Sequence, residues 1–87
     1  MKKMRKAESQ RIHAKKRAAE RFGVELDDAS INRIIQDIQS GKTECLYRRT
    51  NRISVHLIEL AGRLAQCAYD KDRKQIVTFI EFNRKHQ

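Results

Sequence analysis

The chain has 87 residues, which is enough for one hydrophobic core and too few for two. A core of this size is marginal, which argues against the deep buried cofactor cavity of a large enzyme. Hydrophobic residues make up 39% and charged residues 36%, a balance that indicates a folded domain with an ionised surface. The formal net charge of +9 favours a polyanionic partner such as RNA.

The positive charge is unevenly distributed along the chain. Residues 1–21 carry nine Lys or Arg against two Glu, and residues 47–69 carry four against one, whereas residues 22–46 are net negative. Solubility alone does not require such segregation. The distribution therefore favours basic segments that converge on one bound polyanion.

A basic stretch over residues 1–6 opens the chain, and we expect it to be a flexible arm outside the domain. Residues 7–22 are good helix formers, and Gly23 offers the positive φ at which such a helix ends. On a helical wheel, one arc of this helix is rich in Lys and Arg and the other arc is apolar. The apolar arc consists of Met4, Ile12, Ala18, Ala19 and Phe22.

A second helix is predicted from isoleucines that recur at i, i+3, i+4 and i+7. Asp27 and Asp28 precede them, and either carboxylate can cap the helix, which Gly41 ends. This is the strongest periodic signal in the chain and predicts a core-packing element. The four residues are Ile31, Ile34, Ile35 and Ile38.

Beyond Lys42 the apolar period changes to two, which predicts strands over residues 45–49, 53–60, 63–69 and 76–82. In the last strand, strict alternation places Phe79 on the opposite face from Ile76. Short polar turns join the strands, so an antiparallel meander is the simplest arrangement. The predicted fold class is α+β, with two N-terminal helices packed on a four-stranded antiparallel sheet, one domain over residues 7–82 and a polar tail over 83–87.

His13, Arg17 and Arg21 are candidate catalytic residues on the first helix. They are spaced by four residues, so their side chains line one helix face. An imidazole can move a proton near neutral pH, and guanidinium groups stabilise charge on phosphate oxygens. The pattern is typical of phosphoryl chemistry, although a solvated basic helix face has the same composition.

Arg48, Arg49 and Arg52 surround the first hairpin turn. Three guanidinium groups so close together repel one another unless an anion lies between them, which favours a phosphate clamp over a solvated loop. Three further side chains on the predicted strands could hydrogen-bond a phosphate, although each is also ordinary strand composition. They are His56, Tyr69 and Thr78.

No metal or cofactor site is expected. Cys45 and Cys67 lack a CxxC spacing and a matching His pair, so we interpret them as small apolar strand residues in a reducing cytosol. The chain has no P-loop, nucleophile elbow or paired-carboxylate motif. RNA cleavage needs no metal, because the 2′-hydroxyl is a built-in nucleophile.

Five short motifs follow one another along the chain: His13-x3-Arg17-x3-Arg21-Phe22-Gly23, Ile38-x2-Gly41, Arg48-x2-Asn51-Arg52, Tyr69-Asp70 and Ile76-Val77-Thr78-Phe79-Ile80. Taken in this order, they resemble the barnase/EndoU/colicin/RelE-like (BECR) superfamily of small nucleases, in its phage or bacterial toxin-like members. The resemblance implies N-terminal helices on a four-stranded antiparallel sheet, with a metal-independent ribonuclease site between them. It matches the helix His to His13, the helix basic positions to Arg17 and Arg21, the hairpin Arg to Arg48 or Arg52, and the strand-four hydroxyl to Thr78.

The sequence thus predicts a small basic RNA-binding protein that acts as a metal-independent endoribonuclease, with His13 as general acid or base and a 2′,3′-cyclic phosphate product. One alternative is a non-catalytic phage or bacterial protein that binds nucleic acid or inhibits an acidic host protein. Another is a self-associating basic component of a phage particle. The expected partners are RNA or another polyanion and an acidic antitoxin or host protein, with no membrane partner.

No apolar run approaches the roughly 20 residues that cross a bilayer, and no apolar segment follows the basic start of the chain. We therefore expect a cytoplasmic monomer or weak dimer, in the host cytoplasm if the chain is phage-encoded.

Overall fold

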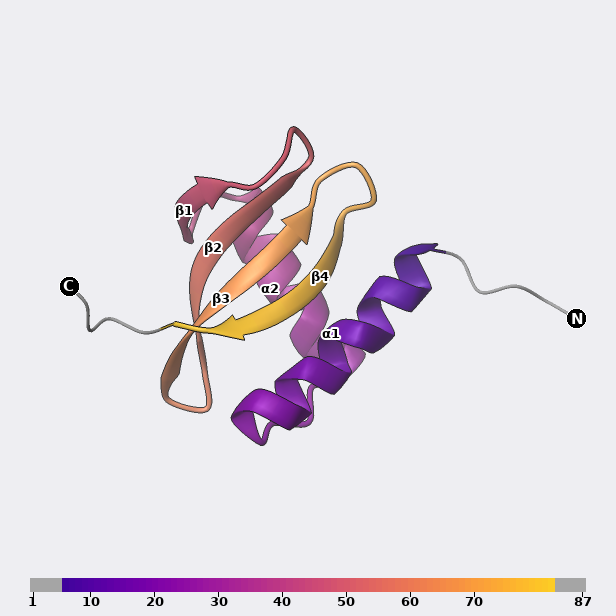
Figure 1. Cartoon of the computed structure of the whole chain (residues 1–87), viewed down its shortest axis with the longest axis vertical. Coiled ribbons are helices and arrows are strands. Elements are labelled where there is room, and N and C mark those ends of the chain that lie inside the picture. The colour runs from indigo at the N-terminus through magenta and orange to yellow at the C-terminus, as the bar shows by residue number, and fades with distance from the viewer. Residues whose placement is uncertain (1–5, 83–87) are drawn as a thin grey trace, which may run out of the picture.

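The computed structural model describes residues 6–82, in which two helices precede a four-stranded sheet (Figure 1). The elements are α1 (Lys6–Phe22), α2 (Asp28–Gln39), β1 (Glu44–Arg48), β2 (Ile53–Leu60), β3 (Arg63–Asp70) and β4 (Gln75–Glu81). The strands lie in the order β1-β2-β3-β4, and all neighbours are antiparallel. The predicted α+β class is confirmed, and the predicted strand bounds agree to within one residue. The predicted arm, apart from Lys6, and the predicted tail lie outside the described residues.

Helix α2 forms as its isoleucine spacing predicts. Asp27 is the N-cap and accepts a hydrogen bond of 2.8 Å from the backbone N–H of Ser30. This bond lowers the pKa of Asp27. Of the two candidate caps the structure therefore uses Asp27, and Ile31, Ile35 and Ile38 are buried beneath the sheet.

Helix α1 buries a different face from the predicted one. Its core residues are Ala14, Ala18 and Phe22, spaced by four, whereas the side chain of Ile12 is 52% exposed and Ala19 is exposed. The predicted apolar arc was therefore right for Ala18 and Phe22 and wrong for Ile12 and Ala19. The physical reason is that α1 lies alongside β4 (Figure 1), and alanines allow the closest approach of a helix to a strand.

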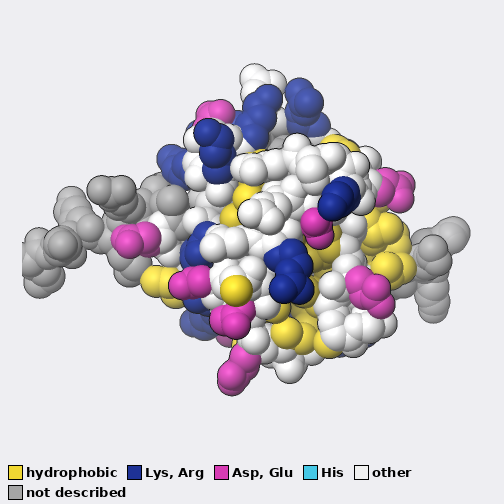
Figure 2. All heavy atoms as spheres, turned by 180° about the vertical axis from the view of Figure 1, so that it is seen from behind, with side chains coloured by type: hydrophobic (Ala, Val, Ile, Leu, Met, Phe, Trp, Pro, Cys, Tyr) yellow, Lys and Arg dark blue, Asp and Glu magenta, His cyan; other side chains and the backbone are white. Residues whose placement is uncertain are grey.

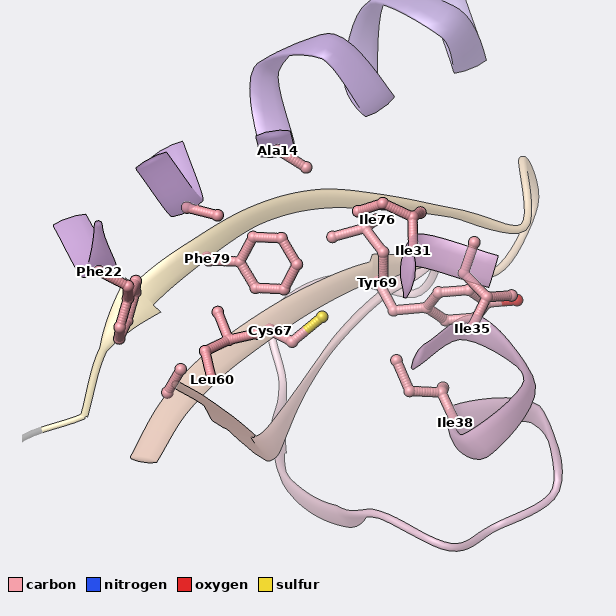
Figure 3. Close-up of a cluster of buried hydrophobic side chains, with 12 residues drawn as sticks. Ala14, Phe22, Ile31, Ile35, Ile38, Leu60, Cys67, Tyr69, Ile76 and Phe79 are labelled. Atoms are coloured by element: carbon pink, nitrogen blue, oxygen red, sulfur yellow. The ribbon is translucent and has the colours of Figure 1, made fainter. Parts of the chain in front are cut away.

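The core fills the space between the helices and one face of the sheet (Figure 3). A β-bulge in β4 leaves Val77 without a cross-strand partner, since Ala68 pairs with Thr78 and the next residue, Tyr69, pairs with Ile76. Ile76 and Phe79 consequently both enter this core. The prediction of strict alternation, which placed them on opposite faces, was wrong because it allowed no bulge.

The outer edge of β4 is protected by α1. The Nη1 atom of Arg21 donates a hydrogen bond of 2.9 Å to the backbone carbonyl of Phe79. An edge carbonyl left without a partner is a site for unwanted strand pairing, and this bond occupies it. Within residues 6–82, neither helix has the length and apolar composition needed to cross a bilayer.

Candidate nucleic-acid interface

The β1–β2 and β3–β4 hairpins end side by side at one end of the molecule (Figure 1). The backbone N–H of Lys71 in one loop donates a hydrogen bond of 2.9 Å to the carbonyl of Arg52 in the other. We call residues 48–52 and 70–74 the hairpin end. Viewed from behind, Lys and Arg side chains gather at this end (Figure 2). Its cations are Arg48, Arg49, Arg52, Lys71, Arg73 and Lys74, against the carboxylates Asp70 and Asp72.

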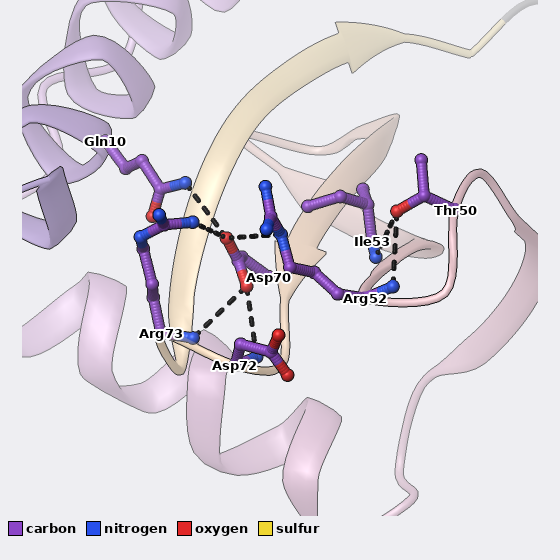
Figure 4. Close-up of polar contacts among 7 residues, drawn as sticks. All are labelled: Gln10, Thr50, Arg52, Ile53, Asp70, Asp72 and Arg73. Carbon is purple, nitrogen blue, oxygen red and sulfur yellow. Dashed lines mark hydrogen bonds and ion pairs between the residues drawn. The ribbon is translucent and has the colours of Figure 1, made fainter.

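The β1–β2 loop is held by its own hydrogen bonds. The Thr50 hydroxyl oxygen accepts hydrogen bonds from the backbone N–H groups of Arg52, at 3.2 Å, and Ile53, at 3.0 Å (Figure 4). The backbone N–H of Arg49 donates to the Ile53 carbonyl at 2.8 Å. A hydroxyl that binds amides two and three residues ahead is typical of an ordered turn. The loop backbone is therefore fixed, while Arg48 and Arg49 are exposed.

The side chain of Asp70 is fully buried and organises the β3–β4 loop (Figure 4). Its Oδ1 accepts hydrogen bonds from the backbone N–H groups of Asp72, at 3.0 Å, and Arg73, at 3.1 Å. Its Oδ2 accepts from Nε2 of Gln10 on α1, at 3.1 Å, and from Nη1 of Arg73, at 2.9 Å, and lies 3.5 Å from Nε of Arg52. One carboxylate thus connects α1 to both hairpin loops.

Electrostatics keep Asp70 ionised in this position. Burial by itself would raise the pKa of Asp70, but the hydrogen bonds from Gln10, Arg73 and the amide of Asp72 outweigh burial and hold the pKa below its ordinary value. The charged carboxylate then offsets part of the repulsion between the two guanidinium groups beside it.

Four of the six cations at the hairpin end form no ion pair with the residues that the structure describes. Within residues 6–82, their side chains make no ion pair and no hydrogen bond, and the four residues are all exposed. Elsewhere several cations are paired with acids, as Lys15 is with Asp28 at 2.7 Å and Arg17 is with Glu20 at 2.8 Å. The four unpaired cations are Arg48, Arg49, Lys71 and Lys74.

The three candidate catalytic residues of α1 make different contacts. His13 is exposed and makes no hydrogen bond or ion pair with the part of the chain that the structure describes. Arg17 is paired with Glu20, and Arg21 is engaged with the Phe79 carbonyl. No contact among the described residues joins these three side chains to the arginines of the hairpin end.

His56 and Tyr69 are buried on the side of the sheet that faces the helices. The His56 ring lies 3.0 Å from the Thr43 hydroxyl through Nδ1 and 2.8 Å from the Ser54 hydroxyl through Nε2, so both nitrogens are occupied. Burial lowers the pKa of His56, which favours the neutral ring. The Tyr69 hydroxyl accepts a hydrogen bond of 2.9 Å from Gln39. Neither side chain is among the exposed groups of the hairpin end.

Thr78 is half-buried on β4. Its neighbour Phe79 faces the core, so Thr78 lies on the other sheet face, paired with Ala68 of β3. Helix α2 is behind the sheet and α1 lies beside it (Figure 1). Thr78 therefore belongs neither to the α1 flank nor to the hairpin end.

No metal centre is formed by the residues that the structure describes: no three His, Cys, Asp or Glu side chains are grouped to hold an ion. Both cysteines are free, with Cys45 exposed and Cys67 in the core. Burial raises the pKa of the Cys67 thiol, which keeps it protonated and unreactive.

Sequence reasoning placed Arg52 in the interface but missed the second hairpin loop, which it treated only as a polar turn. Lys71, Arg73 and Lys74 are the residues that it missed. A local signal was present, because an Asp that binds amides two and three residues ahead is typical of such turns. The contacts of Asp70 with Gln10 and Arg52 are long-range and left no pattern in the chain.

Neither the scan against protein-family models nor the searches of curated proteins and of solved structures finds a match for this chain. The resemblance to the BECR nucleases stays a prediction.

Proposed function

We propose that this protein binds RNA through its phosphate backbone, with the hairpin end as the contact surface. The observation that carries the proposal is the group of four exposed cations, drawn from two adjacent loops, that have no counter-charge among the described residues. Holding like charges together costs free energy, which a bound phosphate offsets, and the same cations displace the counterions condensed on the nucleic acid.

The geometry supports binding more directly than cleavage. General acid–base catalysis needs an imidazole within hydrogen-bonding reach of the reacting atoms and beside the groups that hold the phosphate. His13 has no contact with the hairpin end, and both nitrogens of His56 are occupied by hydroxyls. Metal-independent RNA cleavage through His13 stays a prediction, and it is tested alongside binding.

Two double variants with the same loss of charge test the location of the interface. Arg48→Gln/Arg49→Gln removes two cations from the hairpin end, and Lys16→Gln/Arg33→Gln removes two exposed cations from the helices. Fluorescence anisotropy with a labelled mixed-sequence single-stranded RNA measures both affinities. We expect the hairpin variant to lose about tenfold and the helix variant less than about threefold, since charge-assisted hydrogen bonds to phosphate act only at the interface.

Equal losses in the two double variants would contradict an interface at the hairpin end, and no RNA binding by the unmodified protein at low salt would refute the proposed function. Incubating the unmodified protein and a His13→Ala variant with RNA in EDTA tests cleavage. Cutting by the unmodified protein alone would support a ribonuclease that uses His13. RNA that stays intact with both proteins would contradict cleavage and leave RNA binding as the proposed function.

A further inference from the structure

Arg52 and Arg73 approach the same oxygen atom of Asp70 from different loops (Figure 4). Nε of Arg52 is 3.5 Å and Nη1 of Arg73 is 2.9 Å from Oδ2. These two nitrogens cannot be farther apart than the sum of the two distances, about 6.4 Å. Two guanidinium groups are thus held as neighbours by one carboxylate that is itself fully buried.

Each guanidinium keeps donors that the protein does not use. Arg52 contacts Asp70 only through Nε, which leaves both of its terminal nitrogens without a partner in residues 6–82. Arg73 uses Nη1, which leaves its Nε and Nη2 without one. The Arg52 side chain is 50% exposed and the Arg73 side chain 29% exposed. The free donors are therefore available to a ligand from solvent.

The chemistry of this pair suits a single phosphate group. A planar guanidinium fork donates to two oxygens of a phosphate, with bonds of about 2.8 Å, whereas an ammonium acts as a point charge. The oxygens of one phosphate can accept hydrogen bonds from both guanidinium groups, which the Asp70 carboxylate holds side by side. Lys71 and Lys74 stand in the same loop as Arg73 and leave the local charge positive, although Asp70 neutralises one guanidinium.

We propose that Arg52 and Arg73 form a clamp for one backbone phosphate of the bound RNA, and that Asp70 is the positioning residue that orients both guanidinium groups. This proposal rests on the proposed function, and it adds a defined phosphate site to an otherwise general basic surface. Orientation before binding reduces the side-chain entropy that is lost on contact with the ligand.

Asp70→Asn separates orientation from simple charge. The variant adds one unit of positive charge to the hairpin end, so diffuse electrostatic attraction alone would tighten RNA binding. A clamp that Asp70 orients binds more weakly in the variant, because the guanidinium groups lose their shared anchor. We expect about a fivefold to tenfold loss of RNA affinity despite the added charge, measured at a temperature where circular dichroism shows the variant folded.

Arg73 provides the matched comparison if Asp70→Asn fails to fold. We expect Arg73→Gln to lose about tenfold in RNA affinity, and Lys74→Gln, one residue away with the same change of charge, about threefold or less. Arg73→Lys keeps the charge but not the fork, so it should resemble Arg73→Gln. In an NMR titration with inorganic phosphate, the side-chain Nε–H signals of Arg52 and Arg73 should shift. Each signal is assigned by its disappearance in the corresponding variant, Arg52→Lys or Arg73→Lys.

The outcomes distinguish the clamp from the proposed function. RNA binding that Arg73→Gln and Lys74→Gln weaken equally, or that Asp70→Asn tightens, would overturn the clamp and leave RNA binding intact. Shifts with inorganic phosphate in a protein that binds no RNA would show a phosphate site at the two arginines but refute both the proposed function and its RNA clamp. The absence of shifts at both arginines would count against the clamp whatever the RNA data show.

Discussion

His56 shows how one buried imidazole is kept neutral by its surroundings. Its ring packs edge-on against Tyr69, with centroids 6.4 Å apart, and each nitrogen contacts a hydroxyl. Thr43 and Ser54 can each donate or accept, so they satisfy whichever tautomer is present. A protonated ring would carry its positive charge in a position shielded from water, which is why burial lowers the pKa of His56.

The stability of the protein should therefore fall in mildly acidic solution. With a folded pKa below the ordinary value of 6.5, the unfolded chain takes up the proton first. The free energy of unfolding should be at its plateau above pH 6.5 and decrease as the pH falls below it. Urea unfolding between pH 7.5 and 5.5 measures this slope, which His56→Gln should reduce. Asp70, whose pKa lies below 3.8, does not titrate in that range.

At the scale of elements, the packing of α1 on β4 depends on two alanines. Ala14 and Ala18 are both fully buried, and they bring the helix close enough for Arg21 to reach the Phe79 carbonyl. At the end of α1, the Arg63 guanidinium lies 5.2 Å from the centre of the Phe22 ring and covers it. The helix is thereby fastened along its length to the edge of the sheet.

Adjacent alanines in α1 provide a test of this packing. Ala18→Leu inserts three carbon atoms between helix and strand and should lower the free energy of unfolding by about 1–3 kcal/mol. Ala19→Leu is exposed and should change it by less than about 0.5 kcal/mol. Chemical denaturation of both variants gives the comparison. Equal effects would show that α1 does not bury the Ala14–Ala18 face.

At the scale of the whole molecule, the fold collects cations that are dispersed in sequence. Residues 48–52 and 70–74 are separated by the length of β2 and β3, yet the antiparallel meander returns both loops to the same end of the sheet. The acids of α2 and its flanking loops lie elsewhere in the chain. The result is a molecule with a cluster of cations at one end.

RNA binding should accordingly weaken steeply with salt. Four to six phosphate contacts predict that the logarithm of the association constant falls with the logarithm of salt concentration with a slope of about −3 to −4 for single-stranded RNA. Anisotropy titrations over a series of NaCl concentrations measure this slope. The Arg48→Gln/Arg49→Gln variant should have a shallower slope. An affinity that is independent of salt would contradict phosphate contacts at the hairpin end.

The sequence alone determined the order and bounds of the elements, because helix caps, the isoleucine period of α2 and the turn residues act over a few positions. The strands predicted over residues 53–60 and 63–69 leave Ala61-Gly62 as the turn between them, and both residues have positive φ, as a tight hairpin requires. The sequence also predicts that the arginines of the first hairpin loop bind an anion, since three guanidinium groups within five residues can be recognised from the sequence alone.

Only the tertiary structure decided which faces and loops meet. Whether Ile12 or Ala14 of α1 is buried depends on where β4 lies, and the entry of both Ile76 and Phe79 into the core depends on one bulge in the pairing with β3. The grouping of Arg52 with Arg73 around Asp70 depends on the return of the chain through two strands. These contacts join residues far apart in the chain, and their energies come from burial and charge in a shared space that no local pattern encodes.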